Sequence, residues 1–301
     1  MATTGATAAP KRRWRVSEQT RWGYIFLLPW IFGFVVFTAG PMIASFYLSF
    51  TKYNVIRAPQ FIGLRNYELM LDDRRIPLSL LNTAFYALLH VPGVIIFSLL
   101  LAMLLLRVGR ASGAFRTAFY LPNVTPAVAV GTLFLLLLSG NGLINQVLGA
   151  FGIDGPNWLT DPTWVKPGIV LMSWWTLGAT VVIFFAALRN VPVELYEAAQ
   201  IDGANARQRF RLIVVPFIKP ILLIVTVLQV IWDLRVFTQI FALQDIGGIR
   251  ALTNTLGVYI YQTSIAGGDF GQGGAIAVIT AILLMSISIY YVRQVTKEEE
   301  L

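Results

Sequence analysis

Long apolar runs separated by short polar stretches dominate the chain. Runs of about 20 or more residues, the length that spans a membrane as a helix, fall near residues 23–50, 81–106, 117–139, 167–188, 214–243 and 273–293. Each can cross a hydrocarbon core about 30 Å thick at 1.5 Å per residue. The runs are continuous rather than alternating, which favours helices over strands. The sequence therefore predicts an all-α, polytopic membrane protein with six transmembrane helices.

The polar ends of the chain and its basic residues predict its organisation. We expect a disordered basic tail over residues 1–22, a six-helix domain over 23–293 and a short solvated tail over 294–301. Six spans put both ends on one side, where 15 of the 23 Lys and Arg residues lie. Basic residues favour the cytoplasmic side. Both termini are therefore predicted in the cytoplasm, with the chain in a bacterial or archaeal plasma membrane, although the first outer loop also holds five basic residues.

The amino-acid composition argues against several classes of function. Only 13% of the residues are charged, about half the fraction typical of a soluble domain. The net charge of +8 gathers at the ends of the spans, so we predict contact with a lipid bilayer and not with nucleic acid. No cysteine and one histidine leave no predicted disulfide or metal site. The chain also lacks the glycine-rich G-x-x-x-x-G-K-[ST] phosphate loop, so ATP hydrolysis by that route would need another polypeptide.

A polar stretch over residues 190–216, between the fourth and fifth runs, carries helix start and stop signals. Asn190 is a candidate cap for a first helix, with Pro192 in its first turn. Gly203 is suited to a left-handed stop, and a second short helix can follow from about Asn205. The pattern predicts two short helices around a glycine bend, too polar to enter lipid.

The first of these helices presents one small apolar face. Four residues share it at helical spacing: Leu195, Ala198, Ala199 and Asp202. The adjacent face carries Glu194 and Glu197, whose charges suit a helix N-terminus. Such a helix fits a groove on a soluble partner. The spacing equally fits a surface hairpin that anchors charges among lipid headgroups, and on spacing alone both interpretations stay open.

The order of residues in this stretch resembles a known family. It runs Glu197-Ala198-Ala199, three residues, Gly203, nine residues, then Ile213-Val214-Val215-Pro216. This is similar to the cytoplasmic coupling loop of permease subunits of binding-protein-dependent ABC importers, with Val215 in place of the usual leucine. The resemblance implies that the 194–212 helices dock on an ATPase subunit and couple its closure to the spans. The residues implicated are Glu194, Glu197, Ala198, Ala199, Asp202, Gly203, Ile213 and Pro216.

Further motifs resemble the carbohydrate-uptake branch of these permeases. They include Phe61-Ile62-Gly63-Leu64-x-Asn66-Tyr67, Arg116-x-x-x-x-Tyr120-Leu121-Pro122 and Tyr259-Ile260-Tyr261, whereas Gln244-Asp245-Ile246-Gly247-Gly248 departs from the usual turn. The resemblance implies a transport subunit without its own ATPase site. Its implied partners are ATPase subunits that bind ATP-Mg, a second six-helix permease subunit and an extracytoplasmic substrate-binding protein.

The fifth run contains the candidate substrate pathway. Trp232, Asp233, Phe237 and Gln239 place aromatic rings beside hydrogen-bonding groups near its outer part. Sugars suit such a lining, because rings stack on their C–H faces and polar groups bind their hydroxyls. A neutral di- or oligosaccharide is favoured, since Arg235 is the only basic candidate nearby, with glycerol phosphate or a polyol as the alternative. An aromatic belt with snorkelling side chains is the structural alternative.

Two other classes of function fit the sequence less well. An ion-driven carrier would need acidic residues in mid-span and inverted repeats, and an intramembrane enzyme would need clustered nucleophiles, acids or metal ligands. The single histidine, His90, lies just before Pro92. We predict that its ring hydrogen-bonds a backbone carbonyl freed by that proline, in a structural role.

Overall fold

The computed structural model describes residues 18–245 and 250–299, and nearly all of their regular structure is helical. This confirms the predicted all-α class. The chain divides into two compact units at the bond between Tyr47 and Leu48. Of the predicted basic tail, residues 1–17 lie outside the described part, as do Ile246, Gly247 and Gly248 of the unusual turn.

The first unit is one long apolar helical segment. It consists of α1 (Glu18–Phe34), a π-helical turn η1 (Val35–Ala39) and all but the last residue of α2 (Gly40–Leu48). Large apolar side chains face outward on all sides, and Phe26 is 80% exposed. Because such a surface is stable only in lipid or against another protein, this segment fits the predicted first span.

The second unit begins with a small element that the sequence did not predict. The strands β1 (Thr51–Lys52) and β2 (Gln60–Phe61) pair antiparallel, and α3 (Arg65–Asp72) follows them. The side-chain amide of Asn66 donates to the carbonyl oxygens of Ser49 (2.8 Å) and Thr51 (2.9 Å). This buried amide ties α3 to the preceding loop.

The helices that form the body of this unit follow in chain order. They are α4 (Arg75–Arg107), η2 (Gly109–Ala111), α5 (Ser112–Tyr120), η3 (Leu121–Val124), α6 (Ala127–Leu138), α7 (Leu143–Ala150), α8 (Val165–Ser173), η4 (Trp174–Thr176), α9 (Gly178–Arg189), α10 (Val193–Ile201), α11 (Ala206–Arg209), η5 (Phe210–Val214), α12 (Val215–Leu234), α13 (Thr238–Asp245), α14 (Arg250–Thr253), α15 (Leu256–Tyr261), η6 (Gln262–Ala266) and α16 (Phe270–Glu299).

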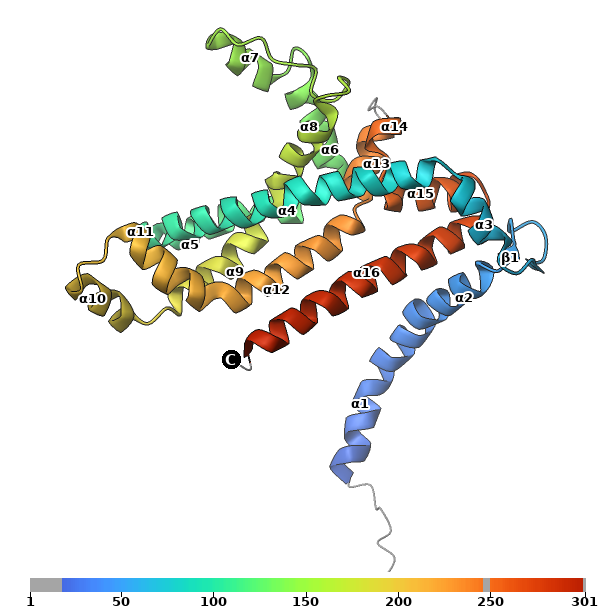
Figure 1. Cartoon of the computed structure of the whole chain (residues 1–301), viewed down its shortest axis with the longest axis horizontal. Helices are drawn as coiled ribbons and strands as arrows, with labels where there is room; N and C mark the ends of the chain where they lie inside the picture. Colours follow the sequence, from blue (N-terminus) through green and yellow to red (C-terminus); the bar gives the residue numbers. More distant parts are fainter. Residues whose placement is uncertain (1–17, 246–249, 300–301) are drawn as a thin grey trace, which may run out of the picture. The chain divides into compact units, whose positions relative to one another are not determined.

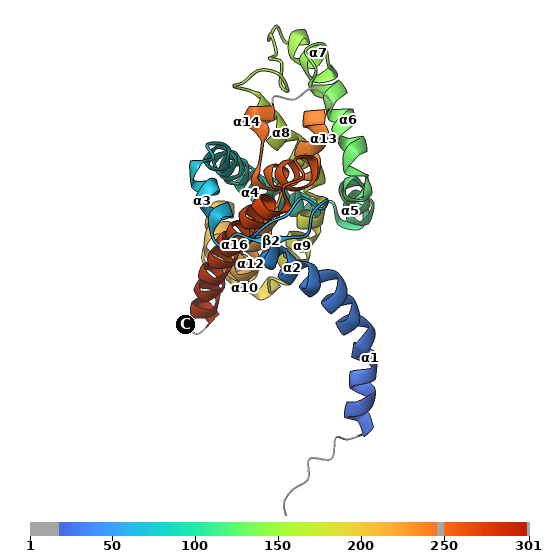
Figure 2. The ribbon, with the colours of Figure 1, turned by 90° about the vertical axis from the view of Figure 1, so that its right-hand side faces the viewer.

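Helices α4, α9 and α12 lie side by side and enclose one apolar core (Figure 1). Its centre includes Ala102, Val181, Phe184 and Ile218, all without exposed surface. A second core joins α6, α8 and α13 around Leu138, Ile169 and Ile240. Figure 2 shows α7, α6 and α5 following one another along one side of this unit. These apolar cores fix the positions of the polar groups described below.

The number of spans agrees with the sequence, but several boundaries do not. Within the described residues, five helical segments are long and apolar enough to cross a membrane, and a sixth arises if the pair 165–176 and 178–189, bent by 54°, is one span. The predicted 117–139 span is interrupted at Thr125, because Pro126 lacks the N–H that a continuous helix needs there. At the C-terminus, α16 stays helical through Glu299, so the predicted tail is largely an extension of this helix.

The predicted span over 214–243 falls within one candidate span, 206–244, but its helix is interrupted. Helix α12 ends at Leu234, and α13 begins at Thr238. The hydroxyl of Thr255 donates to the carbonyl oxygen of Val236 (3.0 Å), and Gly257 lies so close that a Cβ there would be 2.9 Å from the same oxygen. The Val236 carbonyl therefore accepts a hydrogen bond from the start of α15, whereas in a continuous helix it would accept one from its own helix. The break depends on residues far along the chain, which an apolar run cannot reveal.

Candidate functional site

The glycine bend of the 190–216 loop has the predicted geometry. Gly203 has φ +76° and ends α10. Its N–H donates to the carbonyl of Gln200 (3.1 Å), and the N–H of Ala204 donates to that of Ala199 (2.9 Å). These two bonds form a Schellman motif, which satisfies carbonyls left free at a helix end. The left-handed stop predicted at Gly203 is confirmed.

The caps of the two helices differ from the prediction at one end only. Asn205 starts the second helix with a capping box, in which its side chain accepts from the N–H of Gln208 (3.0 Å) and the Gln208 side chain accepts from its N–H (2.8 Å). Asn190, by contrast, ends α9 and does not cap α10. Pro192 occupies the position before α10, since its ring fixes an extended entrance to the helix.

The second helix of the loop is not separate from the fifth span. Helix α11 passes through the π-helical turn η5 directly into α12, as Figure 1 shows. Ile213 lies in that turn, and Pro216 lies in the first turn of α12. Proline has no N–H, so Pro216 cannot donate a helical hydrogen bond, and the wider π-turn before it accommodates this missing bond. The two predicted short helices are thus present as α10 and α11, and the second continues as a helical path from the loop into the bundle.

The outer surface of the loop is exposed and partly apolar. Glu194, Glu197, Ala198 and Asp202 are exposed, and Ala199 is half-buried. Leu195 is 45% exposed and Ile201 is 87% exposed. Tyr196 instead packs against the core of α4, α9 and α12. The predicted face is therefore available to a partner, while Tyr196 fastens the helix to the bundle.

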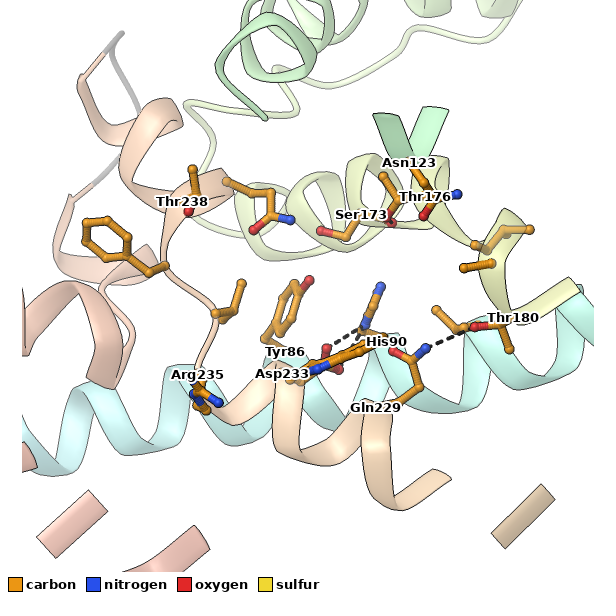
Figure 3. A pocket seen from close by; sticks show the side chains of 17 residues that line it. Tyr86, His90, Asn123, Ser173, Thr176, Thr180, Gln229, Asp233, Arg235 and Thr238 are labelled. Carbon is orange, nitrogen blue, oxygen red and sulfur yellow. Dashed lines mark hydrogen bonds and ion pairs between the residues drawn. The ribbon is translucent and has the colours of Figure 1, made fainter. Parts of the chain in front are cut away.

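A cavity of about 460 Å³ opens at the other end of α12. Trp232, Asp233, Phe237 and Gln239, the four residues predicted for a substrate pathway, all line it. The remaining lining comes from α4, η3, the bent α8–α9 pair, Gln229 on α12 and the 235–238 segment, as Figure 3 shows. The cavity thus joins residues from four of the predicted spans.

A buried pair of ionisable groups lies in the cavity wall. Nδ1 of His90 lies 2.9 Å from each carboxylate oxygen of Asp233. His90 is 7% exposed and Asp233 is 4% exposed. The predicted bond from the His90 ring to a freed carbonyl is therefore wrong, because Asp233 on α12 offers a stronger, charged acceptor. Asp233 is correspondingly buried within the bundle.

Other residues of the wall escaped sequence analysis. The Gln229 side chain donates to the Thr180 hydroxyl (3.0 Å), which links α12 to α9. The Tyr86 ring stacks on His90 with centroids 5.1 Å apart. A signal for Gln229 was present, since it precedes Asp233 by one helical turn on an otherwise apolar helix. Tyr86 and Thr180 gave no such signal.

Trp174 sets the spacing between α4 and the α8–α9 bend. Its ring lies edge-on to Phe97, and its Nε1 donates to the His90 carbonyl (3.4 Å). A Cβ added at Gly93 would lie 2.2 Å from this ring, so only glycine admits it. These contacts give Trp174 a packing role.

A second polar cluster links the start of α4 to α15. Arg75 donates to the Asp73 carboxylate through Nε (2.9 Å) and Nη2 (3.0 Å), and Tyr259 donates to the same carboxylate. Burial opposes ionisation of Asp73, but the hydrogen bonds from Arg75 and Tyr259 outweigh it and lower its pKa to about 2. Burial, together with the bond to Asp73, raises the pKa of Tyr259 to about 12.

Comparisons with known proteins agree with this architecture. The probable ABC transporter permease protein YesP of Bacillus subtilis is 34% identical over 99% of this chain and its own full length. The arabinooligosaccharides transport system permease protein AraP of Halalkalibacterium halodurans is 34% identical over 88% of this chain and 85% of its own.

A solved structure has the same fold. A chain in the crystal structure of a bacterial alginate ABC transporter, in complex with an alginate pentasaccharide-bound periplasmic protein, superposes with a TM-score of 0.81. It is 25% identical, and the match covers 93% of this chain and 96% of that one. A family described as "Binding-protein-dependent transport system inner membrane component" matches residues 94–296. The chain belongs to this family of ABC transporter permease subunits.

Proposed function

We propose that this chain forms half of the translocation pathway of an ATP-driven importer for a neutral di- or oligosaccharide. The observation that carries the proposal is the cavity at the end of α12, which combines aromatic rings with buried hydrogen-bonding groups. Trp232 and Phe237 supply ring faces, and Gln229 and Gln239 supply amides. Rings that stack on C–H faces and polar groups that bind hydroxyls together recognise a sugar.

The similar proteins support a saccharide as substrate but do not distinguish a neutral one, since alginate is an acidic polysaccharide. The name of AraP gives arabinooligosaccharides, and the superposed structure is an alginate transporter. Asp233 is the acidic residue of this lining and Arg235 its guanidinium, with His90 as the remaining ionisable side chain. Because the carboxylate offsets the guanidinium, the cavity offers no excess positive charge for an anion. A neutral sugar therefore fits this cavity better than an acidic sugar or glycerol phosphate.

The 190–216 loop supplies a surface for an ATPase subunit. Exposed Leu195 and Ile201 offer apolar contact, and Glu194 and Glu197 offer charge. ATP-Mg would bind the partner ATPase, so this chain is a transport subunit and not an enzyme. Both termini and the loop face the cytoplasm in this proposal, which the distribution of Lys and Arg supports. A second six-helix permease subunit and an extracytoplasmic binding protein complete the complex.

Affinity purification tests the proposed assembly. The chain, tagged at its C-terminus, is extracted in mild detergent and its partners are identified by mass spectrometry. We expect an ATPase and a second permease subunit, both reduced on Glu197→Ala, while Glu68→Ala, an exposed change outside the loop, retains them. Recovery of this chain alone under several gentle conditions would overturn the proposal.

Reconstituted complexes then identify the substrate. Proteoliposomes containing the complex and its binding protein are supplied with ATP-Mg and radiolabelled arabino-oligosaccharides, neutral disaccharides or glycerol 3-phosphate. We expect uptake of a neutral saccharide. Uptake of glycerol 3-phosphate alone, or uptake that persists without ATP and stops with a protonophore, would contradict the proposed function.

A further inference from the structure

The end of α12 near the cavity is fastened to α4 and α9 by directional polar contacts. Near the loop, α12 packs on α4 and α9 through apolar side chains such as Ile218 and Val225. Near the cavity, His90 on α4 contacts Asp233, and Thr180 on α9 contacts Gln229. Apolar packing tolerates small sliding, whereas a hydrogen bond weakens steeply with changes in distance and angle. Movement of α12 therefore strains these two contacts first.

Beside these contacts, the cavity wall contains a buried polar atom without a hydrogen-bond partner. Nε2 of His90 is buried without a hydrogen-bond partner. A buried nitrogen left unpaired costs about 1–3 kcal/mol, so the described arrangement is incomplete on its own. Water or a sugar hydroxyl in the adjoining cavity would satisfy Nε2 once the ring becomes accessible. The atom thus favours a second arrangement in which His90 faces the cavity.

Helix α12 is connected so that movement of the loop reaches this point. It continues without interruption from α11 and η5, and its 20 residues span about 30 Å at 1.5 Å per residue. The helix ends directly after Asp233, at the break before α13. A rigid rod that ends at a break can shift at its tip without displacing α13.

We propose that the His90–Asp233 and Gln229–Thr180 contacts form a latch, which holds α12 to α4 and α9 in the resting transporter. Movement of the 190–216 loop opens the latch through α12 and turns these four side chains toward sugar hydroxyls. Sugar in the cavity competes for the same groups and favours the open state, so an occupied cavity makes the ATPase cycle easier to complete. The inference rests on the proposed function for its link to ATP.

Variants of the latch test its effect on ATP hydrolysis. We expect Asp233→Asn and Thr180→Val to raise the ATPase rate of the assembled complex without sugar or binding protein. A lost neutral hydrogen bond corresponds to roughly a 5-fold increase for Thr180→Val, and a lost charge-assisted bond to roughly 10-fold or more for Asp233→Asn. Thr226→Val is the matched control, because Thr226 also lies on α12 but its hydroxyl donates within the same helix, to the carbonyl of Leu222. Rates equal to that control would overturn the latch.

Chemical labelling tests the same latch in the isolated chain. His90 is the only histidine, so its carbethoxylation by diethyl pyrocarbonate, quantified by mass spectrometry, reports on one ring. Labelling should be slow in the wild type and at least several-fold faster in Asp233→Asn, with Thr226→Val unchanged. In the assembled complex, vanadate trapping with ATP should accelerate labelling, and transported sugar should then protect the ring. Equal labelling in all these states would contradict the latch even where uptake proceeds normally, whereas failure of assembly would contradict only the proposed function.

Discussion

The 190–216 loop and the cavity at the end of α12 contrast in how their structures are determined. The bend of the loop depends on neighbours in the sequence: Gly203 bonds to Gln200, and Asn205 caps a helix through Gln208. The cavity depends on partners far apart, because His90 and Asp233 are separated by 143 positions. Local hydrogen bonds can be identified from residue types and spacing, while cavity walls require the packed bundle. A single helix, α12, joins these two kinds of structure.

The largest effect is expected where the loop depends on one backbone conformation. Gly203→Val should lower uptake at least 10-fold, because a β-branched residue at φ +76° costs more than the 1–2 kcal/mol typical of left-handed residues. Gly203→Asn is the matched variant, since asparagine tolerates this region. The uptake rate of the Gly203→Asn variant should stay near that of the wild type.

The space at Gly203 makes this test specific. Apart from the neighbouring residues, no atom lies within 4 Å of a Cβ added there, so the valine effect is attributed to the backbone conformation and not to a collision of the Cβ with another part of the chain. If Gly203→Val and Gly203→Asn reduce uptake and ATPase binding equally, the ATPase subunit requires the contact surface of the loop and not its bend.

A change at Gly93 tests the cavity side of the contrast. Gly93→Ala forces its Cβ against the Trp174 ring and separates α4 from the α8–α9 bend. Overpacking of this kind costs about 1–3 kcal/mol, so the melting temperature in detergent should fall by several degrees. Gly149→Ala is the control, with open space around the added Cβ. Equal melting temperatures would show that Trp174 moves away without resistance.

Which features could be predicted from the sequence depends on the same division between local and distant contacts. Gly203 and the Asn205 helix start were predicted, because caps are short-range. Trp232, Asp233, Phe237 and Gln239 were predicted as candidates, since polar groups in an apolar run are conspicuous, and the structure places them on one cavity. Their role as a pathway stays a prediction. Thr180 and Tyr86 were missed, and so was the break after Leu234, because each depends on a partner that only the fold brings near.

A smaller effect is expected from Gln239, which lines the cavity outside the latch. Gln239→Ala should raise the KM for sugar uptake roughly 5-fold, the equivalent of about one hydrogen bond, with little change in basal ATPase rate. Uptake kinetics in proteoliposomes measure this directly. Unchanged kinetics for both Gln239→Ala and Trp232→Ala would remove these residues from the pathway and leave them as packing at the membrane interface.

The cluster of Asp73, Arg75 and Tyr259 combines both kinds of contact and predicts the smallest effect. Asp73 binds Arg75 two positions away and Tyr259 across 186 positions. Its pKa is lowered from 3.8 to about 2 in the folded chain, so the ionised carboxylate stabilises the fold above its ordinary pKa. That contribution is lost as the pH falls from near 4 toward 2.

Melting curves in detergent between pH 5 and about pH 2.5 measure how much stability the fold loses as the Asp73 carboxylate becomes protonated. The wild type should lose more stability than Asp73→Asn over that range, by a few degrees in melting temperature. Glu68→Gln provides the comparison, because the Arg65–Glu68 pair is 62% exposed on both side chains and such pairs contribute little. Tyr259→Phe separates the two contributions: if it removes most of the pH dependence, the distant partner determines the carboxylate's stability. If the dependence remains, the local bond from Arg75 is sufficient, and this junction then resembles the 190–216 loop more than the cavity.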